Sequence, residues 1–261
     1  MIFYIILFLI ILAIIIWGGV TQWRFVNGSG ARENYRKIKL SDILDSHENS
    51  NMEENFKTFN IKGLSDGGIN PGDRRTLFSL LKYFKPQKYL ETGTHIGSSI
   101  ITAAQALPSS SELITVDLVD VNLNKPDKNL LSPKEMIKKL GKKNVNFVVK
   151  SSLDFFDDNN NKFDFIFLDG PHSEDYVFKE VPRALDHLKK NGILLLHDYY
   201  PEGKSLYKGK NPILGPYNAI KNLRKKNLKI KPIPLGKLPW KTKLNSNSTS
   251  LCIIDYYNQF E

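Results

Sequence analysis

Apolar residues recur along the chain in short runs of strand length, separated by segments with the spacing of amphipathic helices. From residue 71 onward this alternation predicts an α/β domain with a doubly wound, mostly parallel sheet, because crossover helices cover both faces of such a sheet. Two late apolar segments, 228–233 and 251–256, predict a C-terminal hairpin that brings the sheet to seven strands. The five earlier predicted strands are at residues 89–90, 113–117, 145–149, 163–168 and 192–196.

Polar residues follow each of these five predicted strands. The carboxyl ends of parallel strands lie along one edge of a sheet, where ligands of such folds bind. The sequence therefore predicts one crevice into which side chains from several strand ends converge. They are Glu91, Asp117, Ser152, Asp169, His172 and Asp198.

The turn at residues 91–97 has the pattern acidic-x-Gly-x-x-x-Gly. Gly93 and Gly97 permit positive φ and a close approach to a ligand, and Ser98 and Ser99 can cap the helix that follows. A dinucleotide site would show G-x-G-x-x-G, and a carboxylate at the strand end would repel a pyrophosphate. S-adenosylmethionine, which carries an ammonium and a sulfonium, fits better; the alternative is a purely structural turn.

With these motifs, residues 70–257 resemble the class I S-adenosylmethionine-dependent methyltransferases, and specifically the small O-methyltransferase-like family with Asp-Gly-x-His and His-Asp at strand ends. The resemblance implies a Rossmann-like methyltransferase fold. It also implies that Asp117 binds the cofactor ribose and Ser152 the adenine. By the same resemblance, the other cofactor-binding residues are Glu91, Gly93, Thr94 and Gly97 of the first turn, together with Asp169.

Two readings of the chemistry remain open. In related catechol-type enzymes two strand-end aspartates and an asparagine bind a divalent cation; Asp169 and Asp198 match the aspartates, but Tyr199 replaces the asparagine. Mg²⁺ or another divalent cation held there would lower the pKa of an acceptor hydroxyl. Without a metal, His172 is the first candidate for general base, with Asp169 as its catalytic neighbour. His197 is expected to hydrogen-bond across the sheet end.

The beginning of the chain predicts a membrane anchor. Residues 2–20 carry no charge and are long enough to cross a bilayer as a helix, with Trp17 and Trp23 near one end. A cleaved signal peptide is disfavoured, since no Lys or Arg precedes the apolar run. Residues 1–22 are therefore expected to be a single-pass transmembrane helix. Basic residues on its C-terminal side, from Arg24 on, predict a cytoplasmic catalytic domain.

Residues 23–70 are polar and predict a tether, so that the methyltransferase domain is expected to span residues 71–261. The glycine-rich stretch 67–72 is either a connection or a lid over the cofactor. The single cysteine, Cys252, excludes a disulfide within the chain and lies in an apolar run typical of a buried strand.

Positive charge concentrates in residues 204–243, which contain twelve Lys or Arg and no Asp or Glu, within a chain of net charge +10. An anionic membrane surface or an acidic substrate would explain this segment, and so would a solvated helix face followed by a protected sheet edge. Nucleic acid is disfavoured as a partner, because the segment shows no recognised nucleic-acid-binding motif of interleaved aromatic and basic residues.

Together these patterns predict a membrane-anchored enzyme that transfers the methyl group of S-adenosylmethionine to a hydroxyl of a sugar, glycolipid or small molecule. The alternative is a membrane-tethered module that binds S-adenosylmethionine or an acidic ligand without catalysis, since a fold does not establish an activity. A nicotinamide-dependent reductase is disfavoured by the spacing of the first turn and by the lack of a Tyr-x-x-x-Lys pair.

Overall fold

The computed structural model describes residues 37–44, 68–123, 131–142 and 144–261. The chain divides into two units, Met1–Lys37 and Ile38–Glu261, and nearly all the described residues belong to the second. The predicted anchor at 1–22 lies outside the described residues. Within the described ranges, no helix has the length and apolar character needed to cross a membrane.

The second unit is built on one seven-stranded sheet in the order β3-β2-β1-β4-β5-β7-β6. Strands β1 to β5 are parallel, and β7 runs antiparallel to both β5 and β6. The predicted doubly wound, mostly parallel sheet and its C-terminal hairpin are therefore confirmed. The strands are β1 (Lys88–Thr92), β2 (Glu112–Asp117), β3 (Val145–Val149), β4 (Phe163–Leu168), β5 (Leu188–Leu196), β6 (Lys231–Pro234) and β7 (Cys252–Asp255).

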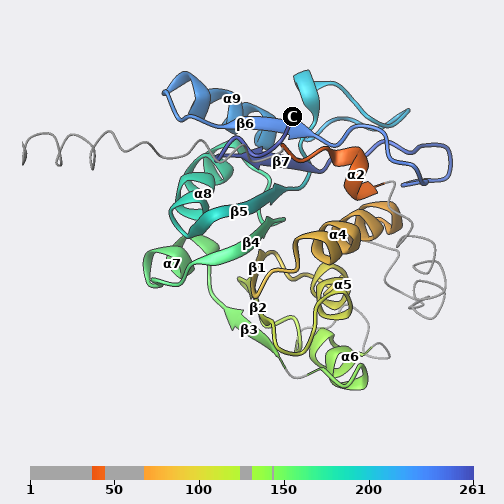
Figure 1. The fold of residues 1–261 in the computed structure, drawn as a ribbon, viewed down its shortest axis with the longest axis vertical. Coiled ribbons are helices and arrows are strands. Elements are labelled where there is room, and N and C mark those ends of the chain that lie inside the picture. Colours follow the sequence, from red (N-terminus) through yellow and green to blue (C-terminus); the bar gives the residue numbers. More distant parts are fainter. Residues whose placement is uncertain (1–36, 45–67, 124–130, 143) are drawn as a thin grey trace, which may run out of the picture. The chain divides into compact units, whose positions relative to one another are not determined.

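Helices cover both faces of the sheet, as Figure 1 shows. One face packs against α2 (Leu40–Leu44), α4 (Pro71–Phe84), α5 (Ser98–Ala106) and α6 (Pro133–Lys139). The other packs against α7 (Ser152–Asp157), α8 (Glu174–Asp186) and α9 (Gly215–Lys225). Alternate residues of one strand enter different cores, for example Tyr89 and Leu90 of β1. Burial on both faces explains why the central strands are continuous apolar runs.

The expectation that Ser98 and Ser99 cap the helix after the first turn was wrong. Helix α5 begins directly after Gly97, which is its N-cap and makes no side-chain hydrogen bond, so Ser98 and Ser99 lie in the first turn instead of capping it. Helix α7 contains Ser152 and is capped by Ser151, whose side chain accepts a hydrogen bond from the N–H of Asp154. Adjacent serines are equally good caps by residue type, and the position where the strand ends decides between them.

The domain boundary also differs from the expected one at residue 71. Ile38 pairs with Phe260 in a β-bridge, and Ile43 and Leu44 of α2 are buried in the core beneath α4. Residues 38–44 therefore belong to the folded unit and not to a polar tether. The remainder of the predicted tether up to residue 67 lies outside the described residues.

Candidate active site

A cavity of about 480 Å³ opens at the carboxyl edge of the parallel strands, within the size range of small-molecule sites. It lies at the point where the strand order reverses between β1 and β4, as expected for an open α/β sheet. Gly68 and Ile69, from the glycine-rich stretch, form part of its wall. The predicted site residues that line it are Gly93, Thr94, Asp117, Ser152, Asp169, His172 and Asp198.

Gly93 is required where it stands because two strand ends meet there. Its φ is +87°, and a Cβ atom on it would lie 2.1 Å from the carbonyl oxygen of Asp169. Gly97 has a φ of +81° and touches Pro133 of α6; it does not line the cavity. Both glycines therefore serve the backbone of this turn, and Gly93 also faces the cavity.

Glu91 is fully buried and is not among the residues that line the cavity. Its carboxylate accepts hydrogen bonds from the hydroxyls of Tyr89, at 3.0 Å, and Thr115, at 2.8 Å. Burial raises the pKa of Glu91 to about 8, although these hydrogen bonds oppose the shift. Thr115 also hydrogen-bonds Thr94, a cavity residue, so Glu91 reaches the site indirectly; its contact with a cofactor stays a prediction.

Asp117 ends β2 at the cavity wall, where its side chain accepts hydrogen bonds from the backbone N–H of His95, at 2.9 Å, and of Val119. These bonds hold the carboxylate against the β1 turn. Asp120, the next carboxylate along the chain, accepts hydrogen bonds from the backbone N–H groups of Asn122 and Leu123 and does not line the cavity. Asp117, the residue predicted to bind the ribose, therefore lies at the cavity wall.

Ser152 lines the cavity beside two residues of α8 that the sequence analysis missed. Its hydroxyl lies 3.0 Å from that of Tyr176 and donates to the carboxylate of Glu180. Burial raises the pKa of Glu180 to about 7. The sequence does contain a signal for Glu180: it is a charged residue on a face of α8 that otherwise carries Val177, Val181 and Ala184.

The strand ends of β4 and β5 place His172 between two carboxylates. Its Nε2 lies 3.4 Å from Asp198 Oδ2 and 3.9 Å from Asp169 Oδ1, and about a third of its side chain is exposed. Asp198 has a φ of +51°, a left-handed conformation that aspartate tolerates better than most residues. The sequence analysis predicted this group, and the structure brings its members together.

His197 lies behind this group and contacts a residue that the sequence did not single out, the buried Asp73 of α4. Burial alone would lower the pKa of His197, but the charge of Asp169, the hydrogen bond to Asp169 and the nearby carboxylate of Asp73 raise it well above its ordinary value. No signal in a single sequence marks Asp73, since an aspartate in the first turn of a helix is ordinary.

The donor set does not fit the aspartate-aspartate-asparagine metal site of catechol-type enzymes. Tyr199, at the asparagine position, is buried in the core between the sheet and α9, with its ring against Tyr217. Asp169 Oδ1 already accepts a hydrogen bond from His197, and Asp198 Oδ1 accepts one from Ser250. Across the described ranges, no three His, Cys, Asp or Glu side chains are grouped to hold a metal ion. The predicted metal role of Asp169 and Asp198 therefore finds no third ligand in the part of the chain that the structure describes.

The cavity does suit S-adenosylmethionine. Three of its lining side chains are carboxylates, namely Asp117, Asp169 and Asp198, which complement a ligand carrying an ammonium and a sulfonium. The glycine turn and the start of α5 supply close backbone contact at one wall. The sheet order and this crevice are typical of the class I S-adenosylmethionine-dependent methyltransferases.

Comparison with known proteins also indicates a methyltransferase. A family described as a methyltransferase domain matches residues 90–199. A caffeoyl-CoA O-methyltransferase of Stellaria longipes is 24% identical over 173 residues, which are 62% of this chain and 66% of that relative. These matches support a class I S-adenosylmethionine-dependent O-methyltransferase-like family.

Solved structures show the same fold. An O-methyltransferase from Bacillus cereus in complex with SAH superposes with a TM-score of 0.55 at 16% identity, covering 82% of this chain and 94% of that one. The O-methyltransferase TomG of Streptomyces achromogenes, involved in tomaymycin synthesis and solved with SAM, gives 0.53 at 16% identity, covering 90% and 96%.

Proposed function

We propose that this chain transfers the methyl group of S-adenosylmethionine to a hydroxyl oxygen of an acceptor bound in the 480 Å³ cavity. The observation that carries the proposal is one cavity with a glycine turn and Asp117 at one wall and His172 between two carboxylates at another. Binding and proton removal can therefore take place in the same crevice.

The residues for holding the cofactor follow the order of the strands. Gly93 and Thr94 would contact its methionine part, Asp117 its ribose hydroxyls and Ser152 its adenine. The buried Glu180 and the half-buried Tyr176 keep the Ser152 hydroxyl in place. When bound, S-adenosylmethionine supplies an electrophilic methyl group, so the protein has mainly to position the reacting atoms.

His172 is proposed as the general base that removes the acceptor proton. The contacts of its ring with Asp169 and Asp198 all use Nε2, which favours the tautomer with the proton on Nε2 and a free lone pair on Nδ1. When Nδ1 takes the proton, both carboxylates stabilise the resulting imidazolium. Proton removal by His172 does not require a metal ion.

The proposed acceptors carry a hydroxyl group, because His172 is proposed to remove a hydroxyl proton. Because one relative is a caffeoyl-CoA O-methyltransferase, catechols join sugars and glycolipids as acceptors to test. The full chain in detergent should bind S-adenosylhomocysteine in calorimetry. It should also transfer isotopically labelled methyl to at least one member of a panel of caffeic acid, simple glycosides and a membrane lipid extract. Binding with no transfer to any of them would favour the non-catalytic binding module.

A membrane location is part of the proposal, supported by the apolar run in residues 1–22 and by exposed basic side chains on α9, such as Lys221, Arg224 and Lys225. The protein should remain in the pellet after carbonate extraction and resist protease added outside intact cells. After residues 1–22 are removed, a variant that lacks the charges of Lys221 and Lys225 should show weaker flotation with phosphatidylserine vesicles than the truncated protein that keeps them. Equal flotation would assign the basic segment to a solvated face.

A further inference from the structure

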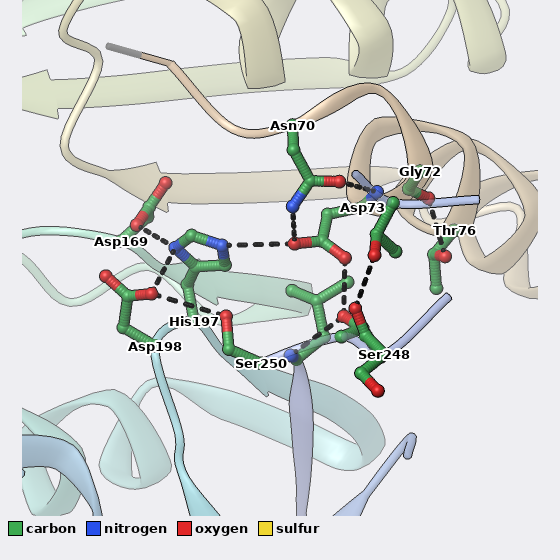
Figure 2. Close-up of polar contacts among 12 residues, drawn as sticks. Asn70, Gly72, Asp73, Thr76, Asp169, His197, Asp198, Ser248 and Ser250 are labelled. Atoms are coloured by element: carbon green, nitrogen blue, oxygen red, sulfur yellow. Dashed lines mark hydrogen bonds and ion pairs between the residues drawn. The ribbon is translucent and has the colours of Figure 1, made fainter. Parts of the chain in front are cut away.

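The imidazole of His197 lies among three carboxylates at the end of β5, as Figure 2 shows. Its Nδ1 is 2.7 Å from Asp169 Oδ1 and 3.8 Å from Asp198 Oδ1, and its Nε2 is 3.5 Å from Asp73 Oδ2. Only 12% of the His197 side chain is exposed, and none of that of Asp73. A buried ring with a charged neighbour at each nitrogen has little freedom to turn.

Asp73 is itself fixed by segments outside the strands that build the cavity. It is the third residue of α4, and its backbone N–H donates to the side chain of Asn70, the N-cap, at 2.9 Å. The Asn70 amide donates to Asp73 Oδ2, and the hydroxyl of Thr249, just before β7, donates to Asp73 Oδ1 at 2.5 Å. The carboxylate that faces His197 is therefore held from both ends of the folded unit.

Burying these carboxylates is costly unless opposite charges or hydrogen bonds compensate for the lost hydration. Among the described residues, the ion-pair contacts of Asp73, Asp169 and Asp198 are all with His172 or His197, and none is with Lys or Arg. Apolar side chains would fill the same space at lower cost. In this cluster Nδ1 of His197 is hydrogen-bonded to Asp169 and Nε2 lies 3.5 Å from the Asp73 carboxylate, and such directional polar contacts specify one geometry.

We propose that Asp73 and His197 form a positioning pair that holds the Asp169 carboxylate beside the base His172. Asp73 does not line the cavity, so it acts through His197. Asp73 fixes the orientation of the ring, and Nδ1 of His197 fixes the Asp169 oxygen that lies 3.9 Å from His172. The inference rests on the proposed function and extends the catalytic apparatus to α4, outside residues 90–199.

The kinetic test uses three variants and a control. Asp73→Asn and His197→Gln should each lower kcat at least about tenfold with the best acceptor of the panel, while the Kd for S-adenosylhomocysteine changes by less than about twofold. Because both residues act by one route, the double variant should be no more than about twofold slower than His197→Gln. Thr76→Val is the control: it removes another buried hydrogen bond of α4, to the Gly72 carbonyl, and should keep the wild-type kcat.

A second readout needs no acceptor. The chain contains five histidines, so ¹⁵N-histidine labelling resolves each ring, and the His197→Gln variant assigns the His197 signals. In the protein without ligands, Asp73→Asn should shift the His197 ring nitrogens and Thr76→Val should not. If wild type methylates nothing, the proposed function fails, and this measurement still decides whether the pair exists.

Three results would overturn the positioning pair: unshifted His197 signals in Asp73→Asn, additive losses in the double variant, or a loss confined to cofactor affinity. If Asp73→Asn unfolds at the assay temperature, His197→Gln carries the kinetic test alone. A kcat near that of wild type for His197→Gln then rejects the proposal.

Discussion

At the scale of single residues, the carboxyl groups of the site fall into two kinds. Glu91 and Glu180 are buried among hydroxyls, and burial raises their pKa values to about 8 and about 7. Asp169 and Asp198 instead contact imidazoles. The first kind lies behind the cavity and holds the hydroxyls of Thr115 and Ser152, and the second surrounds His172.

Replacing His172, the proposed general base, gives the most direct test of the chemistry. His172→Ala should lower kcat by on the order of 10² to 10⁴-fold, because a positioned general base contributes about that much, and should leave cofactor affinity nearly unchanged. Steady-state kinetics and calorimetry on the same preparation measure the two quantities. A fall of less than about tenfold would remove His172 from the role of base.

The raised pKa of Glu91 predicts a pH-dependent stability. Between pH 4.5, the ordinary pKa, and about pH 8, the folded protein binds more protons at this group than the unfolded chain does. Stability at this site is therefore lost as the pH rises through that window. Denaturant unfolding of the protein without cofactor should show that Glu91→Gln gains stability relative to wild type from pH 5 to pH 8. A constant difference would show that Glu91 ionises normally.

At the scale of elements, the β1–α5 turn depends on contact with β4. Gly93→Ala would set a Cβ 2.1 Å from the Asp169 carbonyl, in a left-handed conformation, and should cost roughly 3–5 kcal/mol of stability. Gly141→Ala is the matched control: its φ is +69° and no atom lies within 4 Å of the added Cβ, so only the conformational cost of about 1 kcal/mol applies.

Urea unfolding of both glycine variants measures this difference. Equal losses would mean that the β1 turn can move away from Asp169. Because Gly93 serves folding as well as the cavity wall, its substitution cannot isolate cofactor binding, and Asp117→Asn at the wall is the better variant for that purpose.

At the scale of the whole molecule, the folded unit begins at Ile38. Ile43→Ala should cost about 2–4 kcal/mol, because the Ile43 side chain is 1% exposed and packs in the core beneath α4. Leu244→Ala, at a side chain that is 84% exposed, should change stability by less than about 0.5 kcal/mol. If both variants unfold at the same urea concentration, α2 contributes no stability and the tether would extend to residue 70.

The sequence by itself determined the sheet and its active edge. Strands buried on both faces must be apolar throughout, and parallel strands must expose their ends along one edge. These two local rules located β1 to β5 and brought Asp117, Ser152, Asp169, His172 and Asp198 to one cavity. The C-terminal hairpin followed from the same reasoning, although β6 begins at Lys231 and not at residue 228.

Only the tertiary structure decided which polar groups are partners. Asp73 and Thr249 are 176 positions apart, and Ser152 and Glu180 are 28 apart. Glu91, predicted to contact the ligand, is buried and hydrogen-bonded to Tyr89 and Thr115, and its contact with a cofactor stays a prediction. Periodicity along a chain tells which face of an element is buried. The partner of a buried polar group depends on which distant segment packs against that face, and no local pattern contains that information.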